Sequence, residues 1–216
     1  MKIINLSENN SLLNQYLKEI RSTAIQQDSM RFRRNIERIG EVMAVEVSKA
    51  LSYEKENVQT PLGIASVNTI QDPIVLGTVL RAGLPFHQGF LNMFDHAENA
   101  FLSAYRRMGA DNQLEIVSEY LASPDLTGKT LLLVDPMLAS GMSMEVAYQA
   151  LLKNGTPKHL HVCCVIAAPE GVQHLQNTMP AETTLWCAAI DNNLNEKKYI
   201  VPGLGDAGDL CFGDKL

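Results

Sequence analysis

The sequence predicts an α/β protein built on a parallel β-sheet that helices cover on both faces. From Pro73 onward, short apolar runs alternate with helical stretches, and each run is apolar along most of its length rather than at every second residue. Such runs are typical of parallel strands buried on both faces, and ligands of such sheets bind at the carboxyl ends of the strands. The chain has 216 residues, which suits one domain with a substantial core.

The first third of the chain has helical periodicity. Apolar residues recur at helical spacing between Leu12 and Ile20 and again between Phe32 and Val47. Asp28 and Ser29 separate the two stretches and offer N-cap chemistry for the second helix. The next segment, Val58 to Val67, has two short β-like pieces around a Pro-x-Gly turn, which predicts a small hairpin.

The strands and helices of the sheet region follow from the alternation of apolar and amphipathic segments. Strands are predicted at Ile74 to Leu80, Leu131 to Val134, His161 to Ala168 and Thr183 to Ala189, and helices at Ser143 to Asn154 and Glu170 to Thr178. Gly155 follows the first helix as a C-cap residue should. The last stretch, from Ile190, is rich in Gly, Asp and Asn and has little regular pattern, which is typical of disorder or of a binding element.

Composition narrows the function classes. The net charge of -6 and pI near 5.4 argue against a nucleic-acid partner or an anionic membrane, so an anionic ligand must be held by local groups. No apolar run approaches the roughly 18 residues of a membrane-spanning helix, and the first residues do not resemble a signal peptide. The four cysteines have no Cys-x-x-Cys spacing and read as buried, reduced side chains, so we expect a cytoplasmic protein.

The segment LLLVDPMLASGMSM, residues 131–144, has the pattern of a phosphate-binding loop. Pro136 cannot extend a strand, and Gly141 can adopt positive φ before a helix that opens at Ser143. Several free N–H groups and the positive helix end would then face one point, which suits a phosphate, while Asp135 could accept hydrogen bonds from sugar hydroxyls. It is not a Walker loop, since Met142 stands where Lys is required. The alternative is an ordinary capped turn between strand and helix.

Other stretches carry a resemblance to a family. This loop, with TVLRAGLPF around Arg81, SAYRR around Arg106, AAPEGV at Ala167 to Val172 and YIVPGLGDAGD from Tyr199, resembles the type I phosphoribosyltransferases. The Asp-Pro-Met-Leu-Ala-Ser-Gly form is similar to that of the uracil phosphoribosyltransferases in particular. The resemblance extends from Ile74 to the C-terminus. It implies one domain, with a helical arm over residues 1–57 and a catalytic core with a base-binding tail over residues 58–216.

The resemblance implies transfer of ribose phosphate from phosphoribosyl diphosphate to N1 of uracil, giving UMP and diphosphate in pyrimidine salvage. Magnesium would arrive with the diphosphate, and no dedicated protein metal site is expected. Arg106, Asp135 and Asp206 would be the catalytic residues. The phosphoribosyl ligand would contact Arg81, Arg106, Asp135, Pro136, Met137, Leu138, Ala139, Ser140, Gly141, Met142, Ser143 and Asp206, and uracil would contact Ile200, Gly205, Asp206 and Ala207.

Several alternatives stay open. An arginine can equally be solvated or ion-paired, although the motif around Arg81 argues against this for Arg81. Asp206 could simply stabilise a turn. Many relatives have Gly at the position of Met142, and the closing loop 107–113 also departs from the family. A homodimer or higher homo-oligomer is expected from the family and from the apolar N-terminal helices. The rival functions are a nucleotide-sensing regulator with weak catalysis and an enzyme that uses a purine base.

Overall fold

A mostly parallel sheet organises the chain, of which the computed structural model describes residues 1–103, 105–108, 114–117 and 120–214. Every neighbouring pair of strands on its path is parallel except the last, because β8 runs antiparallel to β5. A short additional strand, β10 (Met137–Leu138), pairs with β11. The order across the sheet is β1 (Lys2–Asn5), β12 (Thr184–Ile190), β11 (His159–Ala167), β9 (Thr130–Val134), β4 (Ile74–Leu80), β5 (Glu98–Ser103) and β8 (Leu121–Ala122).

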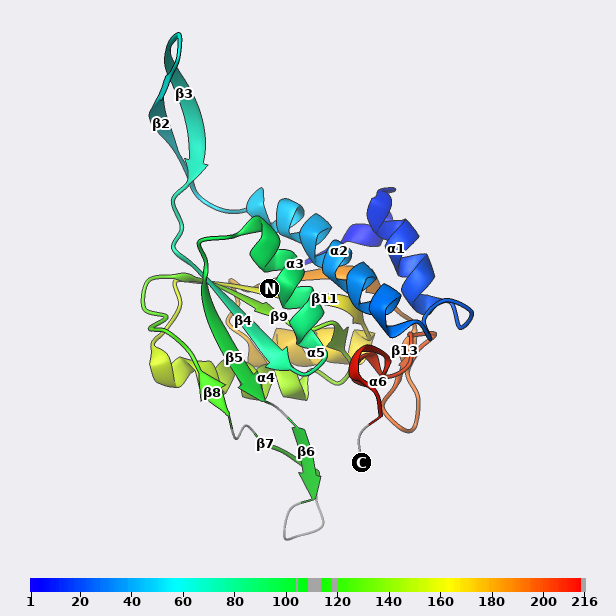
Figure 1. Ribbon diagram of the computed structural model, residues 1–216. Coiled ribbons are helices and arrows are strands. Elements are labelled where there is room, and N and C mark those ends of the chain that lie inside the picture. Colours follow the sequence, from blue (N-terminus) through cyan, green and yellow to red (C-terminus); the bar gives the residue numbers. More distant parts are fainter. Residues whose placement is uncertain (104, 109–113, 118–119, 215–216) are drawn as a thin grey trace.

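Helices cover both faces of this sheet, as the continuous apolar runs predict. One face packs against α1 (Leu12–Arg21), α2 (Ser29–Ser48) and α3 (Gly83–Met93). The other packs against α4 (Met142–Leu151), which the short 3-10 helix η2 (Leu152–Asn154) extends, and against α5 (Pro169–Thr178). Figure 1 shows the two layers on either side of the sheet. Cys163 and Cys164 illustrate the alternation, because they belong to the cores of opposite faces. All four cysteines are buried and free, as expected.

The N-terminal helices are part of this packing. The side chains of Leu13, Phe32 and Ile36 are buried in the same core as Leu132 and Trp186 of the sheet. The Asp28 side chain accepts a hydrogen bond from the Arg31 amide (3.0 Å) and so caps α2, as predicted. The helices of the expected arm over residues 1–57 thus form one layer of the core, and residue 57 falls inside the strand β2 (Tyr53–Thr60).

The predicted hairpin is present and longer than expected. It consists of β2 (Tyr53–Thr60) and β3 (Gly63–Ile70), which pair antiparallel along their whole length. Figure 1 shows it projecting away from the body of the protein. Apolar side chains on it face solvent, most of all Leu62 (99% exposed) and Ile64 (72% exposed).

The sequence analysis missed several elements. It gave no strand at β1 or β5 and no helix at α3, and it described the C-terminal stretch as irregular. That stretch instead contains the paired strands β13 (Asn193–Leu194) and β14 (Ile200–Val201) and the helix α6 (Ala207–Phe212). The remaining elements are the 3-10 helix η1 (Leu6–Glu8) and the paired strands β6 (Tyr105–Met108) and β7 (Leu114–Val117). Within the described part of the chain, no helix is long and apolar enough to cross a membrane.

Candidate active site

A cavity of about 720 Å³ opens at the carboxyl ends of β4, β5 and β9, which meet at one edge of the parallel sheet. Three segments supply most of its wall. They are residues 79–82 at the end of β4, most of residues 135–144 after β9, and residues 197–199 and 205–208 near the C-terminus. The cavity therefore brings the loop and the tail that the sequence singled out into one place.

Backbone hydrogen bonds fix the start of the loop after β9. The Pro136 carbonyl accepts hydrogen bonds from the amides of Val165 (3.1 Å) and Ile166 (3.0 Å), and the Leu138 carbonyl accepts one from Ala168 (2.9 Å). These bonds fasten residues 136–138 to the neighbouring strand β11. The end of β9 at Val134, just before Asp135-Pro136, agrees with the prediction from Pro136.

The loop then turns into α4 in the way a phosphate site requires. Gly141 is the N-cap of α4 and has φ 82. Glycine adopts this positive φ without strain because it has no Cβ. No described side chain caps this helix, so the amides of its first turn are available to a ligand. The helix begins at Met142, one residue earlier than predicted. Ala139, Ser140, Gly141 and Ser143 line the cavity.

Met142 does not disturb the loop. Its side chain is 41% exposed, and the residue is not among those that line the cavity. Pro136 likewise contributes backbone bonds to β11 rather than a cavity wall. Below the first turn of α4, Glu145 pairs with His174 of α5 (2.7 Å between Oε2 and Nε2), which fastens the helix to its neighbour.

Asp135 lies on the cavity wall directly after β9. Its carboxylate accepts a hydrogen bond from the Met137 amide (3.0 Å), and burial raises its pKa from 3.8 to about 7. The desolvated carboxyl therefore holds its proton more tightly than an ordinary aspartate does. A ligand that donates hydrogen bonds to it, or that brings a cation near it, would favour its charged form.

Arg81 follows a cis peptide bond at the end of β4 and lines the cavity. Its guanidinium pairs with the carboxylate of Asp209 in α6 (3.2 Å), although we expected Arg81 not to be ion-paired. This contact brings the end of β4 within hydrogen-bonding distance of α6, and the expected role of Arg81 at the diphosphate stays a prediction. The backbone of Arg106 lies in β6 opposite Ile116 of β7, and its side chain is outside the described residues. The closing loop 107–113 falls largely outside them as well.

The C-terminal tail contributes backbone groups and the Asp206 carboxylate to the cavity wall. Gly205, Asp206 and Ala207 line the cavity, whereas Ile200 is 4% exposed, packs into the core and is not among the residues that line the cavity, so its contact with uracil stays a prediction. The Asp206 side chain accepts a hydrogen bond from the Asp209 amide (3.0 Å) and caps α6. The alternative of a local structural role therefore holds for Asp206 alongside its place in the cavity wall.

Sequence reasoning missed some residues that the cavity brings together, chiefly Lys197, Lys198 and Tyr199 at its rim. Lys198 has φ 63 in a turn that Asn195 closes, with the Lys198 amide donating to the Asn195 carbonyl (2.9 Å). A lysine with positive φ is uncommon, and such positions concentrate at functional sites. The run Asn-Glu-Lys-Lys before the recognised motif carries no spacing signal that could have revealed this.

Comparisons with known proteins agree with the geometry. A family model described as uracil phosphoribosyltransferase matches residues 7–214. A protein of Porphyromonas gingivalis named uracil phosphoribosyltransferase is 55% identical over 216 residues, covering 100% of both chains. One of the same name from Pyrococcus furiosus is 38% identical over 192 residues, covering 88% of this chain and 82% of its own. A solved structure of a protein from Aquifex aeolicus superposes with a TM-score of 0.85 at 31% identity and covers 98% of each chain. The chain belongs to the uracil phosphoribosyltransferase family.

Proposed function

We propose that this protein transfers ribose 5-phosphate from phosphoribosyl diphosphate to N1 of uracil, producing UMP and diphosphate for pyrimidine salvage. The observation that carries the proposal is that one cavity wall joins the loop within residues 135–144 to residues 197–199 and 205–208. Relatives named uracil phosphoribosyltransferase, similar along the whole chain, support it. The enzyme is then a pentosyltransferase.

The loop after β9 holds the ribose 5-phosphate half of the ligand. The amides of Ala139 to Ser143 bind the 5-phosphate with the positive end of α4, and the hydroxyls of Ser140 and Ser143 add donors. Asp135 accepts hydrogen bonds from the ribose hydroxyls. The raised pKa of its carboxyl supports this role, since a partly buried acid that pairs with no cation among the described residues gains from new donors.

The diphosphate lies toward Arg81 and Arg106. The Arg81 guanidinium exchanges its weak pairing with Asp209 for the diphosphate oxygens, which a planar fork can bind in two places. Magnesium bound to the diphosphate fits this arrangement, because the ion binds phosphate oxygens together with one or two carboxylates, and those of Asp135 and Asp206 belong to residues that line the cavity. When bound, the ion would neutralise charge on the leaving group.

The tail reads the base with its backbone. Uracil has a hydrogen-bond acceptor, a donor and an acceptor along one edge: O2, N3–H and O4. The backbone N–H and C=O groups of Ile200, Gly205 and Ala207 can form hydrogen bonds with these three groups. Cytosine lacks the N3 proton and has a donor at position 4, so it would leave buried groups unpaired, which discriminates strongly.

Catalysis requires no protein nucleophile. The transition state resembles an oxocarbenium ion, so the residues act by holding the ribose and uracil in line and by stabilising the departing charge. Arg106 and Arg81 serve the leaving group, and Asp135 and Asp206 lie where positive charge develops on the ribose.

A panel of bases tests this proposal. The protein would be incubated with phosphoribosyl diphosphate, Mg²⁺ and either uracil, cytosine or hypoxanthine, and the nucleotide products separated by chromatography. We expect UMP from uracil and no product from the other two bases. IMP from hypoxanthine would establish the purine alternative. Binding of phosphoribosyl diphosphate without any product would favour the regulator with weak catalysis.

We also propose a homodimer or higher homo-oligomer. The apolar N-terminal helices no longer support it, because their apolar faces are buried in the chain's own core. Support comes instead from the hairpin β2–β3, which exposes Leu62 and Ile64 and which would be only marginally stable in water by itself. Light scattering on the purified protein tests this, and a monomer at micromolar concentration would contradict it.

A further inference from the structure

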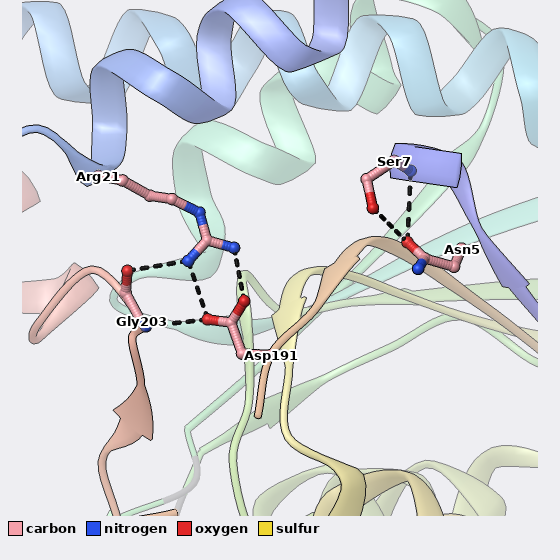
Figure 2. A network of polar contacts seen from close by, with 5 residues as sticks. All are labelled: Asn5, Ser7, Arg21, Asp191 and Gly203. Carbon is pink, nitrogen blue, oxygen red and sulfur yellow. Dashed lines mark hydrogen bonds and ion pairs between the residues drawn. The ribbon is translucent and has the colours of Figure 1, made fainter. Parts of the chain in front are cut away.

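A partly buried ion pair links the N-terminal helix α1 to the tail (Figure 2). Arg21, the last residue of α1, donates from Nη2 to Asp191 Oδ1 (2.7 Å) and from Nη1 to Asp191 Oδ2 (2.9 Å). Asp191 directly follows β12, and its side chain is 6% exposed. Such a fork-to-carboxylate pair fixes both partners in direction as well as in distance.

The same two side chains hold both backbone groups of Gly203. The Gly203 amide donates to Asp191 Oδ2 (2.9 Å), and its carbonyl accepts from Arg21 Nη1 (3.0 Å), as Figure 2 shows. Gly203 has φ 62, and a Cβ at this position would lie 2.1 Å from the Ile200 carbonyl oxygen. The turn that follows β14 is therefore specified by its glycine and by the ion pair together.

We infer that Arg21 and Asp191 are positioning residues for uracil recognition. Gly203 lies two residues before Gly205, which lines the cavity, and Leu204 between them is buried in the core. The backbone groups assigned to the base flank this fixed point on both sides, at Ile200 and at Gly205 to Ala207. A displaced Gly203 would shift them all relative to the phosphate loop. This inference rests on the proposed function.

The ion pair matters more when backbone groups bind the uracil than it would if side chains did. A side chain can rotate to recover a hydrogen bond, whereas a peptide group moves only with its chain. Binding sites of this kind need their groups held to about 0.5 Å. The phosphate loop is fastened separately, to β11 and α5. Loss of the ion pair should therefore raise the KM for uracil far more than the KM for phosphoribosyl diphosphate, for which Asp206 is the one contact assigned to the tail.

Arg21→Lys and Asp191→Asn test this directly. Lysine keeps the charge but loses the fork, and asparagine can still accept from the Gly203 amide but loses the charged pairing. The matched control is Arg31→Lys, because Arg31 forms an equally bidentate pair with Glu19 (2.8 and 2.9 Å) that joins α1 to α2.

We expect both test variants to raise the KM for uracil on the order of 10- to 100-fold. The KM for phosphoribosyl diphosphate should stay within about twofold of the wild type, as should both constants of the control. A loss of folded protein or of kcat with both KM values unchanged, or an equal rise in both, would show that the pair only stabilises the fold and would overturn the inference. Absence of UMP formation by the wild type would instead reject the proposed function.

Discussion

Replacing Asp135 with asparagine should stabilise the protein at neutral pH while weakening its activity. The change keeps the shape of the side chain and an oxygen that can accept the Met137 amide, but it removes the carboxyl whose pKa burial raises to about 7. In the unfolded chain this carboxyl has its ordinary value of 3.8. The folded state therefore holds its proton more tightly than the unfolded state does.

The sign and size of the effect follow from this difference. Below about pH 3 the acid is protonated in both states and contributes nothing, and as the pH rises toward 7 the unfolded state ionises first, so stability falls. Above about pH 8 the full cost is present, and at about 1.4 kcal/mol per pKa unit it amounts to about 4 kcal/mol. Asparagine avoids this cost, so the gain should grow from about 0.5 kcal/mol at pH 4 to about 4 kcal/mol at pH 8.

Chemical denaturation of both proteins at several pH values from 4 to 8 measures this gain. Groups other than Asp135 are common to the two proteins and cancel in the difference. A gain that does not change between pH 4 and pH 8 would refute the reasoning, because it could not come from a titrating carboxyl. In the same variant, UMP formation at pH 8 should fall at least about tenfold, since a neutral amide is a poorer partner for the ribose and its developing charge.

Three further substitutions follow from the geometry of the cavity wall. Gly141→Ala places a Cβ at a residue with φ 82, 3.0 Å from both the Gly171 carbonyl and the ring of His174, so we expect a destabilisation of about 1–2 kcal/mol. We also expect a raised KM for phosphoribosyl diphosphate, and an unchanged KM would argue against phosphate binding by this loop. Lys198→Gly relieves a positive φ of 63 and should stabilise the fold by up to about 1 kcal/mol, and equal or lower stability would contradict the strain. Loss of the lysine charge at the rim of the cavity should also weaken UMP binding, measured by titration calorimetry. Asp206→Asn preserves the cap on the Asp209 amide, so the melting temperature should not change. Turnover should fall at least about tenfold, and a wild-type rate would remove Asp206 from the catalytic residues.

Strong local signals made much of the fold predictable. The runs that became β4, β9, β11 and β12 are long, apolar and bounded by turn residues, and the amphipathic stretches of α1 and α2 repeat over several turns. The conformation of the loop after β9 was predictable as well, because Pro136 and Gly141 have conformational effects that depend on no distant contact.

The missed elements depend on tertiary contacts. The helix α3 contains Pro85 and Gly89, which lower helix propensity, yet Gly89 is needed because α2 crosses so closely that a Cβ there would lie 2.1 Å from the Glu37 carbonyl. The edge strand β1 has four residues and is defined by its pairing with β12. Likewise, the pairing of Arg81 with Asp209 joins residues 128 apart in the chain, and no local pattern indicates it.

Amide hydrogen exchange with and without UMP tests most directly whether one site joins the loop to the tail. UMP carries both the 5-phosphate and the base, so saturating UMP should slow exchange in residues 138–144 and 199–208 together. The hairpin at residues 53–70 serves as an internal control and should keep its rate. Protection of the loop alone would contradict base recognition by the tail, and protection of neither segment would contradict the account of the site.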